Sequence, residues 1–175
     1  MIKYCIISIL LFVTLISATQ NTRDLELIRA AFQDIEKEED VKSIIDFKII
    51  DTIKANVNVL KAYKGAAQCM MAAYVFSPVA KLRNFNEGKK ILEGSIMDNR
   101  NVENIYLRLL IQLNVPKILE YHKSIDEDIL FLNEHLPKEP IDMAYKNLMI
   151  QNLVSVAKNK EQKNALLQIK LSESS

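Results

Sequence analysis

Apolar side chains recur along most of this chain at intervals of three and four residues, which places them on one face of an α-helix. The first such stripe begins at Leu25 and predicts a helix over residues 22–37; the second predicts a helix over residues 41–55. The second stripe is rich in β-branched residues, which are also typical of strands. Because its spacing is nearer to ~3.6 than to ~2 and no Gly or Pro interrupts it, we expect a helix there.

The same spacing predicts further helices downstream. Pro78 disfavours helical geometry at Ser77 and is expected to end the long apolar stripe before it. Asn84 or Asn86 is then expected to cap the helix that follows. These helices are predicted over residues 58–76, 85–97, 102–114, 125–136 and 140–154, with a last amphipathic turn or two over residues 165–171.

Several of these helices have recognisable starts. Asn101 is expected to be the N-cap of the helix over 102–114, and Ser124 and Glu127 have the spacing of a capping box. Pro140 fits the first position of the helix that it opens. We therefore expect an all-α fold of stacked antiparallel helical hairpins, about six or seven helices in all.

One part of the pattern resembles a known family. Gly65, in an alanine-rich helix, lets a neighbouring helix approach closely. The segment Tyr63-Lys64-Gly65-Ala66, then residues 85–96 with Phe85 and Gly88, then Asp98 and Asn101, resembles a tetratricopeptide helix pair. The resemblance implies a helical solenoid fragment, although Gly65 and Gly88 are 23 residues apart, which is too far for a standard repeat. The arrangement also resembles small uncharacterised exported proteins of Bacteroidota-type bacteria, which implies no known activity.

The first residues have the pattern of an export signal. Lys3 is the only charged residue before Arg23, and an apolar run follows it and ends near Ala18. This run is shorter than a membrane-spanning helix requires, so we expect residues 1–18 to be a cleaved secretory signal peptide, with retention as an anchor as the alternative. The remaining chain, residues 19–175, is expected to be a single helical domain with residues 172–175 frayed, located in the periplasm or secreted.

Composition then narrows the functions to consider. The sequence has 23 basic and 22 acidic residues, so charge gives no argument for nucleic acid as a partner. Only Cys69 remains after signal cleavage, so an internal disulfide is excluded and the fold depends on core packing. With the signal removed, we expect no stable membrane span.

The residues that usually carry catalysis are sparse. His122 and His135 are the only histidines, and they lie 13 residues apart without the neighbours that a metal site needs, so we expect no metal and no cofactor. Cys69 lies in an apolar stripe, where a thiol is normally inert. The alternative that we keep is a small hydrolase or transferase that uses His122 with Asp126 or Glu127.

The most informative polar residue is Arg108. Together with Asn101, Asn104 and Gln112, it forms a narrow polar track on an otherwise apolar helix. A charged guanidinium there needs water or a carboxylate, and the candidates for a structural ion pair are Asp126, Glu127 and Asp128. The other interpretation is a binding groove that holds a peptide carboxylate. Its candidate residues are Tyr63, Tyr106, Arg108, Gln112 and Tyr121.

These observations favour a non-enzymatic function. We expect an exported protein that acts as a protein or peptide interaction module in the cell envelope, with a partner that the sequence does not name.

Overall fold

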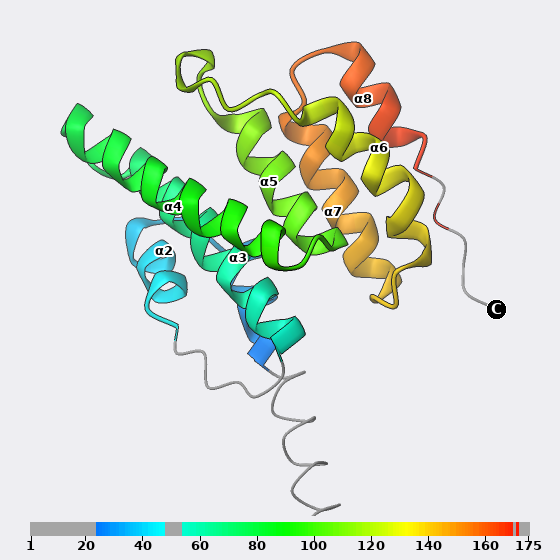
Figure 1. Ribbon diagram of the computed structural model, residues 1–175, viewed down its shortest axis with the longest axis horizontal. Helices are drawn as coiled ribbons and strands as arrows, with labels where there is room; N and C mark the ends of the chain where they lie inside the picture. Colours follow the sequence, from blue (N-terminus) through cyan, green and yellow to red (C-terminus); the bar gives the residue numbers. More distant parts are fainter. Residues whose placement is uncertain (1–23, 48–53, 170, 172–175) are drawn as a thin grey trace, which may run out of the picture. The chain divides into compact units, whose positions relative to one another are not determined.

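The computed structural model describes residues 24–47, 54–169 and 171, and within these ranges it contains helices and no β-strand (Figure 1). The predicted all-α fold is therefore confirmed. The predicted signal peptide over residues 1–18 and the tail over residues 172–175 lie outside the described residues, as does the middle of the predicted helix over 41–55.

A first helix covers residues 24–33. The α-helices that follow are α2 (Glu38–Ile45), α3 (Lys54–Met70), α4 (Pro78–Asp98), α5 (Val102–Asn114), α6 (Ile125–His135), α7 (Met143–Val156) and α8 (Lys160–Leu167). Short 3₁₀ turns, η1 to η3, cover Met71–Ala73, Lys117–Leu119 and Leu136–Lys138.

The chain divides into two compact units, residues 1–91 and 92–175, and the boundary between them falls inside α4. Each unit is described below by itself. The single domain over residues 19–175 stays a prediction.

In the N-terminal unit, α2 packs against α3. Val41 and Ile44 of α2 are buried, as the apolar stripe predicts. Phe32 from the first helix meets Tyr63 of α3 edge to face, with ring centroids 5.2 Å apart. Both rings are buried, so they are part of this unit's core.

The close helix approach expected at Gly65 is present. A Cβ atom at Gly88 of α4 would lie 2.5 Å from the carbonyl oxygen of Gly65 and 2.7 Å from Sγ of Cys69, and against the backbone nitrogen of Cys69. Such distances are far below van der Waals contact. Gly88 is therefore required because α3 and α4 touch backbone to backbone at this point.

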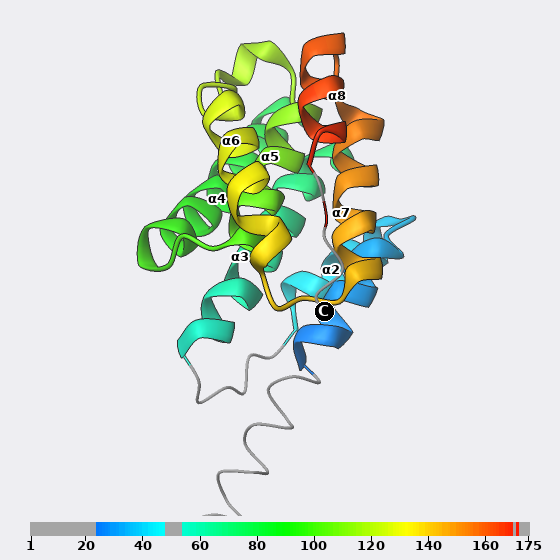
Figure 2. The same cartoon turned by 90° about the vertical axis from the view of Figure 1, so that its right-hand side faces the viewer.

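The C-terminal unit is built around α5, whose residues are buried except for Leu110 and Asn114. The helix packs against α6 and α7, and α8 packs against both of these helices (Figure 2). Asn101 is the N-cap of α5, since its side chain accepts a hydrogen bond from the backbone N–H of Asn104 at 3.0 Å. The predicted bounds and cap of this helix are confirmed.

Two predictions for the N-terminal unit are wrong. The helix predicted over residues 41–55 ends at Ile45, and the N–H of Phe47 tightens the last turn by bonding to Ile44. β-Branched residues lose side-chain freedom in a helix, so ending the helix before more of them are included costs less free energy. The helix predicted from residue 85 begins instead at Pro78. Ser77 precedes it, with its Oγ 3.4 Å from the N–H of Ala80, so Pro78 starts a helix there.

Four other predictions about helix starts and caps also differ from the structure. Asn84 lies inside α4 and bonds to the carbonyl of Ala80, so it is not a cap. Ser124 precedes α6 but its side chain makes no capping bond. Asp142 rather than Pro140 marks the start of α7, because its Oδ1 accepts from two backbone N–H groups. Asn159 likewise caps α8. The helix therefore begins at Lys160, within a polar segment where the apolar pattern predicted no helix.

Candidate functional site

The charge on Arg108 is held inside the C-terminal unit by two carboxylates. Its Nε and one terminal nitrogen donate to the two oxygens of Asp128 on α6, at 2.8 and 2.6 Å. Its other terminal nitrogen donates to Glu93 on α4, at 3.0 Å. The Glu93 carboxylate also accepts from the hydroxyl of Tyr121, at 2.5 Å. We call Arg108, Asp128, Glu93 and Tyr121 the arginine cluster.

Burial makes this cluster sensitive to the loss of a partner. The side chain of Asp128 is fully buried, that of Arg108 is 10% exposed and that of Glu93 is 32% exposed. Burial by itself would lower the pKa of Arg108, but the hydrogen bonds and charges of Asp128 and Glu93 outweigh it and raise that pKa. Burial raises the pKa of Asp128, and the Arg108 guanidinium offsets part of this effect. The guanidinium therefore stays charged and fixes α6 against α5.

The three acidic residues predicted as partners of Arg108 make different contacts in the structure. Asp128 contacts Arg108, but Glu127 pairs with Arg100 at 2.7 Å on the surface, and Asp126 points into a cleft described below. The sequence pattern did not indicate Glu93, because it lies 15 residues before Arg108 and reaches it only through helix packing. The sequence signal that could have indicated a partly buried Glu93 was its place between the apolar residues Leu92 and Ile96.

The residues predicted for a groove are all buried: Tyr63, Tyr106, Arg108, Gln112 and Tyr121. Tyr63 belongs to the N-terminal unit and the other four to the C-terminal unit. The hydroxyl of Tyr106 accepts from Asn152 at 3.0 Å, and Oε1 of Gln112 is buried without a hydrogen bond. Because these side chains are buried in their observed positions, a ligand would meet other residues first.

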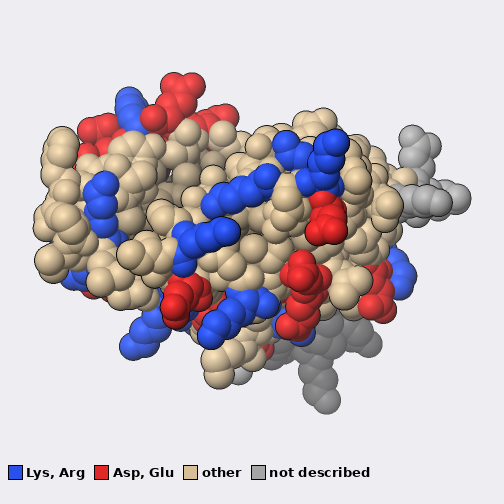
Figure 3. All heavy atoms as spheres, turned by 90° about the horizontal axis from the view of Figure 1, so that it is seen from above, with Lys and Arg blue, Asp and Glu red and all other residues tan. Residues whose placement is uncertain are grey.

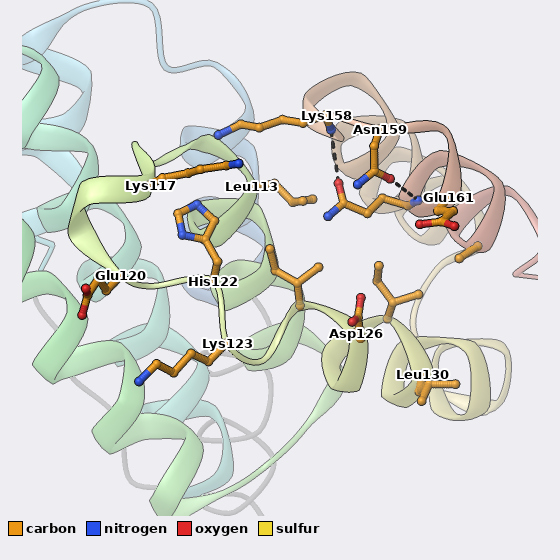
Figure 4. A pocket seen from close by; sticks show the side chains of 14 residues that line it. Leu113, Lys117, Glu120, His122, Lys123, Asp126, Leu130, Lys158, Asn159 and Glu161 are labelled. Carbon is orange, nitrogen blue, oxygen red and sulfur yellow. Dashed lines mark hydrogen bonds between the residues drawn. The ribbon is translucent and has the colours of Figure 1, made fainter.

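An open cleft of about 1200 Å³ lies elsewhere in the C-terminal unit (Figure 4). It is bordered by the end of α5, the connection that contains η2, α6, and the start of α8. Apolar side chains that line it come from three of these helices: Leu113, Ile125, Ile129, Leu130 and Ala165. The charged and polar residues that line it are Lys117, Glu120, His122, Lys123, Asp126, Lys158, Asn159, Glu161 and Gln162.

Basic groups converge at one end of this cleft. The carbonyl oxygen of Val115 accepts from Nζ of Lys158 at 3.1 Å and lies 3.2 Å from Nε2 of His122. The ammonium group of Lys117 points toward the same region (Figure 4). Pro116 stops α5, so the Val115 carbonyl is left outside the helix and these side chains satisfy it. We call Lys117, His122 and Lys158 the basic end of the cleft.

Two of the three acidic residues that line the cleft, Asp126 and Glu161, lie away from the basic end, whereas Glu120 lies on the side of Lys117 and His122 (Figure 4). Asp126 and Glu161 line the side of the cleft formed by α6 and α8 (Figure 4). Asn159 and Gln162 lie nearby, and the N–H of Gln162 bonds to the side chain of Asn159 at 2.8 Å. The cleft thus has a positive end, an apolar lining and a negative side.

The remaining histidine is in a different environment. His135 stacks on Phe131 of α6, with ring centroids 4.1 Å apart, and its Nδ1 lies 2.9 Å from the carbonyl of Phe131. The guanidinium group of Arg100 lies over the ring of Phe131, 4.7 Å from the ring centre. Within the described ranges, no three His, Cys, Asp or Glu side chains come together as a metal site requires.

None of the helices in the described part of the chain is long and apolar enough to cross a bilayer. No protein-family model matches the sequence, and the comparisons with curated proteins and with solved structures also find no match.

Proposed function

We propose that this protein is a non-enzymatic binding module that holds a peptide segment of a partner protein in the cleft of its C-terminal unit. The observation that carries the proposal is the cleft itself, with its apolar lining and its oppositely charged sides. Ligand sites are usually concave, mainly apolar and equipped with a few polar groups that fix orientation. A peptide has the same combination, since it carries apolar side chains between charged groups.

The charge distribution suggests how the peptide is oriented. A carboxylate of the peptide, either a side chain or its C-terminus, fits the basic end formed by Lys117, His122 and Lys158. Its basic groups fit Asp126 and Glu161. Lys and Arg side chains are visible together with Asp and Glu side chains on the face that carries residues 115–123 and the start of α8 (Figure 3).

The arginine cluster supports this function indirectly. Leu113 lies on α5, and Ile125 and Ile129 lie on α6, so the cleft keeps its shape only while these two helices stay in register. The bidentate contact between Arg108 and Asp128 fixes that register. We propose an exported protein of the cell envelope as the context, as the N-terminal sequence pattern suggests.

A direct test uses peptides selected from a random displayed library against the intact protein. Binding is then measured by fluorescence anisotropy for the wild type and for Ala165→Phe, which fills the cleft. We expect Ala165→Phe to weaken binding about tenfold or more, since it blocks contact with the lining. Ala144→Phe, on an exposed position of α7 outside the cleft, is the matched control and should bind normally. Equal binding by both variants would contradict the proposal.

The basic end is tested separately. Lys158→Gln should weaken binding of peptides that carry a carboxylate, whereas Lys163→Gln, also at an exposed position but outside the cleft lining, should not. If the two variants bind alike, the proposed orientation is incorrect even where the cleft binds peptide.

One observation favours the hydrolase or transferase alternative, because His122 and Asp126 line the same cleft. Glu127 does not line it, and no Ser, Thr, Cys or Tyr is among the described residues that do. With no hydroxyl or thiol in the lining, a water molecule activated by His122 is the simplest nucleophile for a hydrolase here. Cleavage of a bound peptide that is lost in His122→Ala would support this alternative, and intact peptide after prolonged incubation would count against it.

A further inference from the structure

We propose that the tip of the α3–α4 hairpin, residues 76–83, docks on an anionic lipid surface. Phe76 is 100% exposed, Val79 is 78% exposed and Leu82 is 50% exposed. Every other residue of this tip is also exposed, apart from the half-buried Ala80. Large apolar side chains gathered at one projecting turn are unusual on a monomer and mark an interaction surface.

The charged residues within this tip are all basic. Residues 52–86 contain five basic residues and no acidic residue, although the whole chain has nearly equal numbers of both. Two of the five, Lys81 and Arg83, lie within the tip and are exposed. In Figure 3 the surface at the end where α4 begins is mostly uncharged, with basic side chains beside it. Apolar side chains flanked by Lys and Arg are the pattern of a segment that binds an anionic membrane interface.

The size of the tip favours lipid over protein. A stable protein interface buries about 1,200–2,000 Å² in total, much more than three side chains on one turn can cover. Insertion into the headgroup region has no such requirement, because each apolar side chain contributes independently as it leaves water. Shallow docking also needs no membrane-spanning helix.

The test is sedimentation with vesicles of phosphatidylcholine alone and of phosphatidylcholine mixed with phosphatidylglycerol. All proteins carry the same N-terminus, so any contribution of residues 1–18 is common to them. We expect the wild type to bind the anionic vesicles more tightly, with an affinity that falls as salt is added. The double variant Phe76→Ser/Val79→Ser should bind at least about tenfold more weakly.

The control for lost apolar surface is Leu167→Ser, which removes a residue that is 65% exposed on α8, outside the tip. It should change vesicle binding by less than about twofold. Lys81→Gln/Arg83→Gln should weaken binding to anionic vesicles by about fivefold per charge and leave binding to neutral vesicles unchanged. Circular dichroism of each variant shows that the fold is retained.

Three results would overturn the proposal. The first is equal binding of the wild type to both vesicle types, and the second is unchanged binding by Phe76→Ser/Val79→Ser. The third is a concentration-dependent dimer that this double variant abolishes, without vesicle binding, which would assign the tip to a second copy of the chain. Peptide binding in the cleft is measured independently, so the two proposals fail separately.

Discussion

Arg108 on α5 donates hydrogen bonds to both carboxylate oxygens of Asp128 on α6, with nitrogen–oxygen distances of 2.8 and 2.6 Å. This paired geometry is the strongest form of an arginine–carboxylate contact. Because Asp128 is fully buried, water cannot replace the guanidinium if it is removed. The contact therefore decides the stability of the C-terminal unit more than any exposed ion pair does.

The first prediction is that Arg108→Ala lowers the free energy of unfolding by about 3–5 kcal/mol, since it leaves a buried carboxylate unpaired. Glu93→Gln should cost less, because Glu93 is partly exposed. The double variant Arg108→Met/Asp128→Leu should be more stable than Arg108→Met alone. Urea unfolding measures all of these, and an Arg108→Ala protein as stable as the wild type would contradict the role of the arginine cluster.

The second prediction compares two glycines of α4. Gly88→Ala should destabilise the protein, because its Cβ would overlap the backbone of Gly65 and Cys69. Gly94→Ala should instead stabilise it by about 0.5–1 kcal/mol, since nothing lies within 4 Å of the added atom and alanine favours the helix. Thermal melts of both variants provide the measurement. Two shifts in the same direction would argue against the close approach of α3 and α4.

The third prediction concerns helix caps. Asn101→Ala should cost about 1 kcal/mol of stability, because Asn101 accepts a hydrogen bond from the N–H of Asn104. Ser124→Ala, at the start of α6, should change stability much less, since its side chain makes no capping bond. The urea concentrations at the unfolding midpoints of the two variants test this contrast. The sequence spacing of Ser124 and Glu127 alone would instead predict a similar loss of stability for both variants.

The fourth prediction is a pH dependence at the start of α2. The Asp40 carboxylate accepts a hydrogen bond from the backbone N–H of Glu36 and another from that of Lys37, each at 3.0 Å. These bonds, chiefly the one from Glu36, lower the pKa of Asp40 below the usual 3.8. A lowered pKa stabilises the folded state above pH 3.8, and this contribution is lost as the pH falls through the folded-state pKa. Nuclear magnetic resonance titration of the Asp40 carboxyl should therefore give a midpoint below that of Asp40 in the urea-unfolded chain. Equal midpoints would contradict the prediction.

Local patterns in the sequence predicted local structure well. Apolar spacing indicated α5 and α6, and the single residue Asn101 marked where α5 begins, because both signals act within one or two turns of a helix. The start of α4 was missed for a related reason, as Ser77 and Pro78 are compatible with both the end of one helix and the start of the next.

Contacts between distant segments were harder to predict. Asp128 was among the expected partners of Arg108, but Glu93 was not, since its contact depends on how α4 packs beside α5. At the basic end of the cleft, the Val115 carbonyl accepts a hydrogen bond from Lys158, which lies 43 residues downstream. A lysine in a polar segment gives no sign in the sequence of such a role. The exposed tip at Phe76 was likewise missed, because an aromatic residue next to an apolar stripe is normally buried.

The unit boundary inside α4 has a practical consequence for dissecting the protein by truncation. A fragment that began at Asn101 would include α5 to α8 but would lack Glu93, which anchors Arg108 and Tyr121. It would also lack the carbonyl of Ser95, to which Asn104 is tied. The last two turns of α4 therefore support α5, and a C-terminal fragment that keeps these contacts has to begin no later than Leu92.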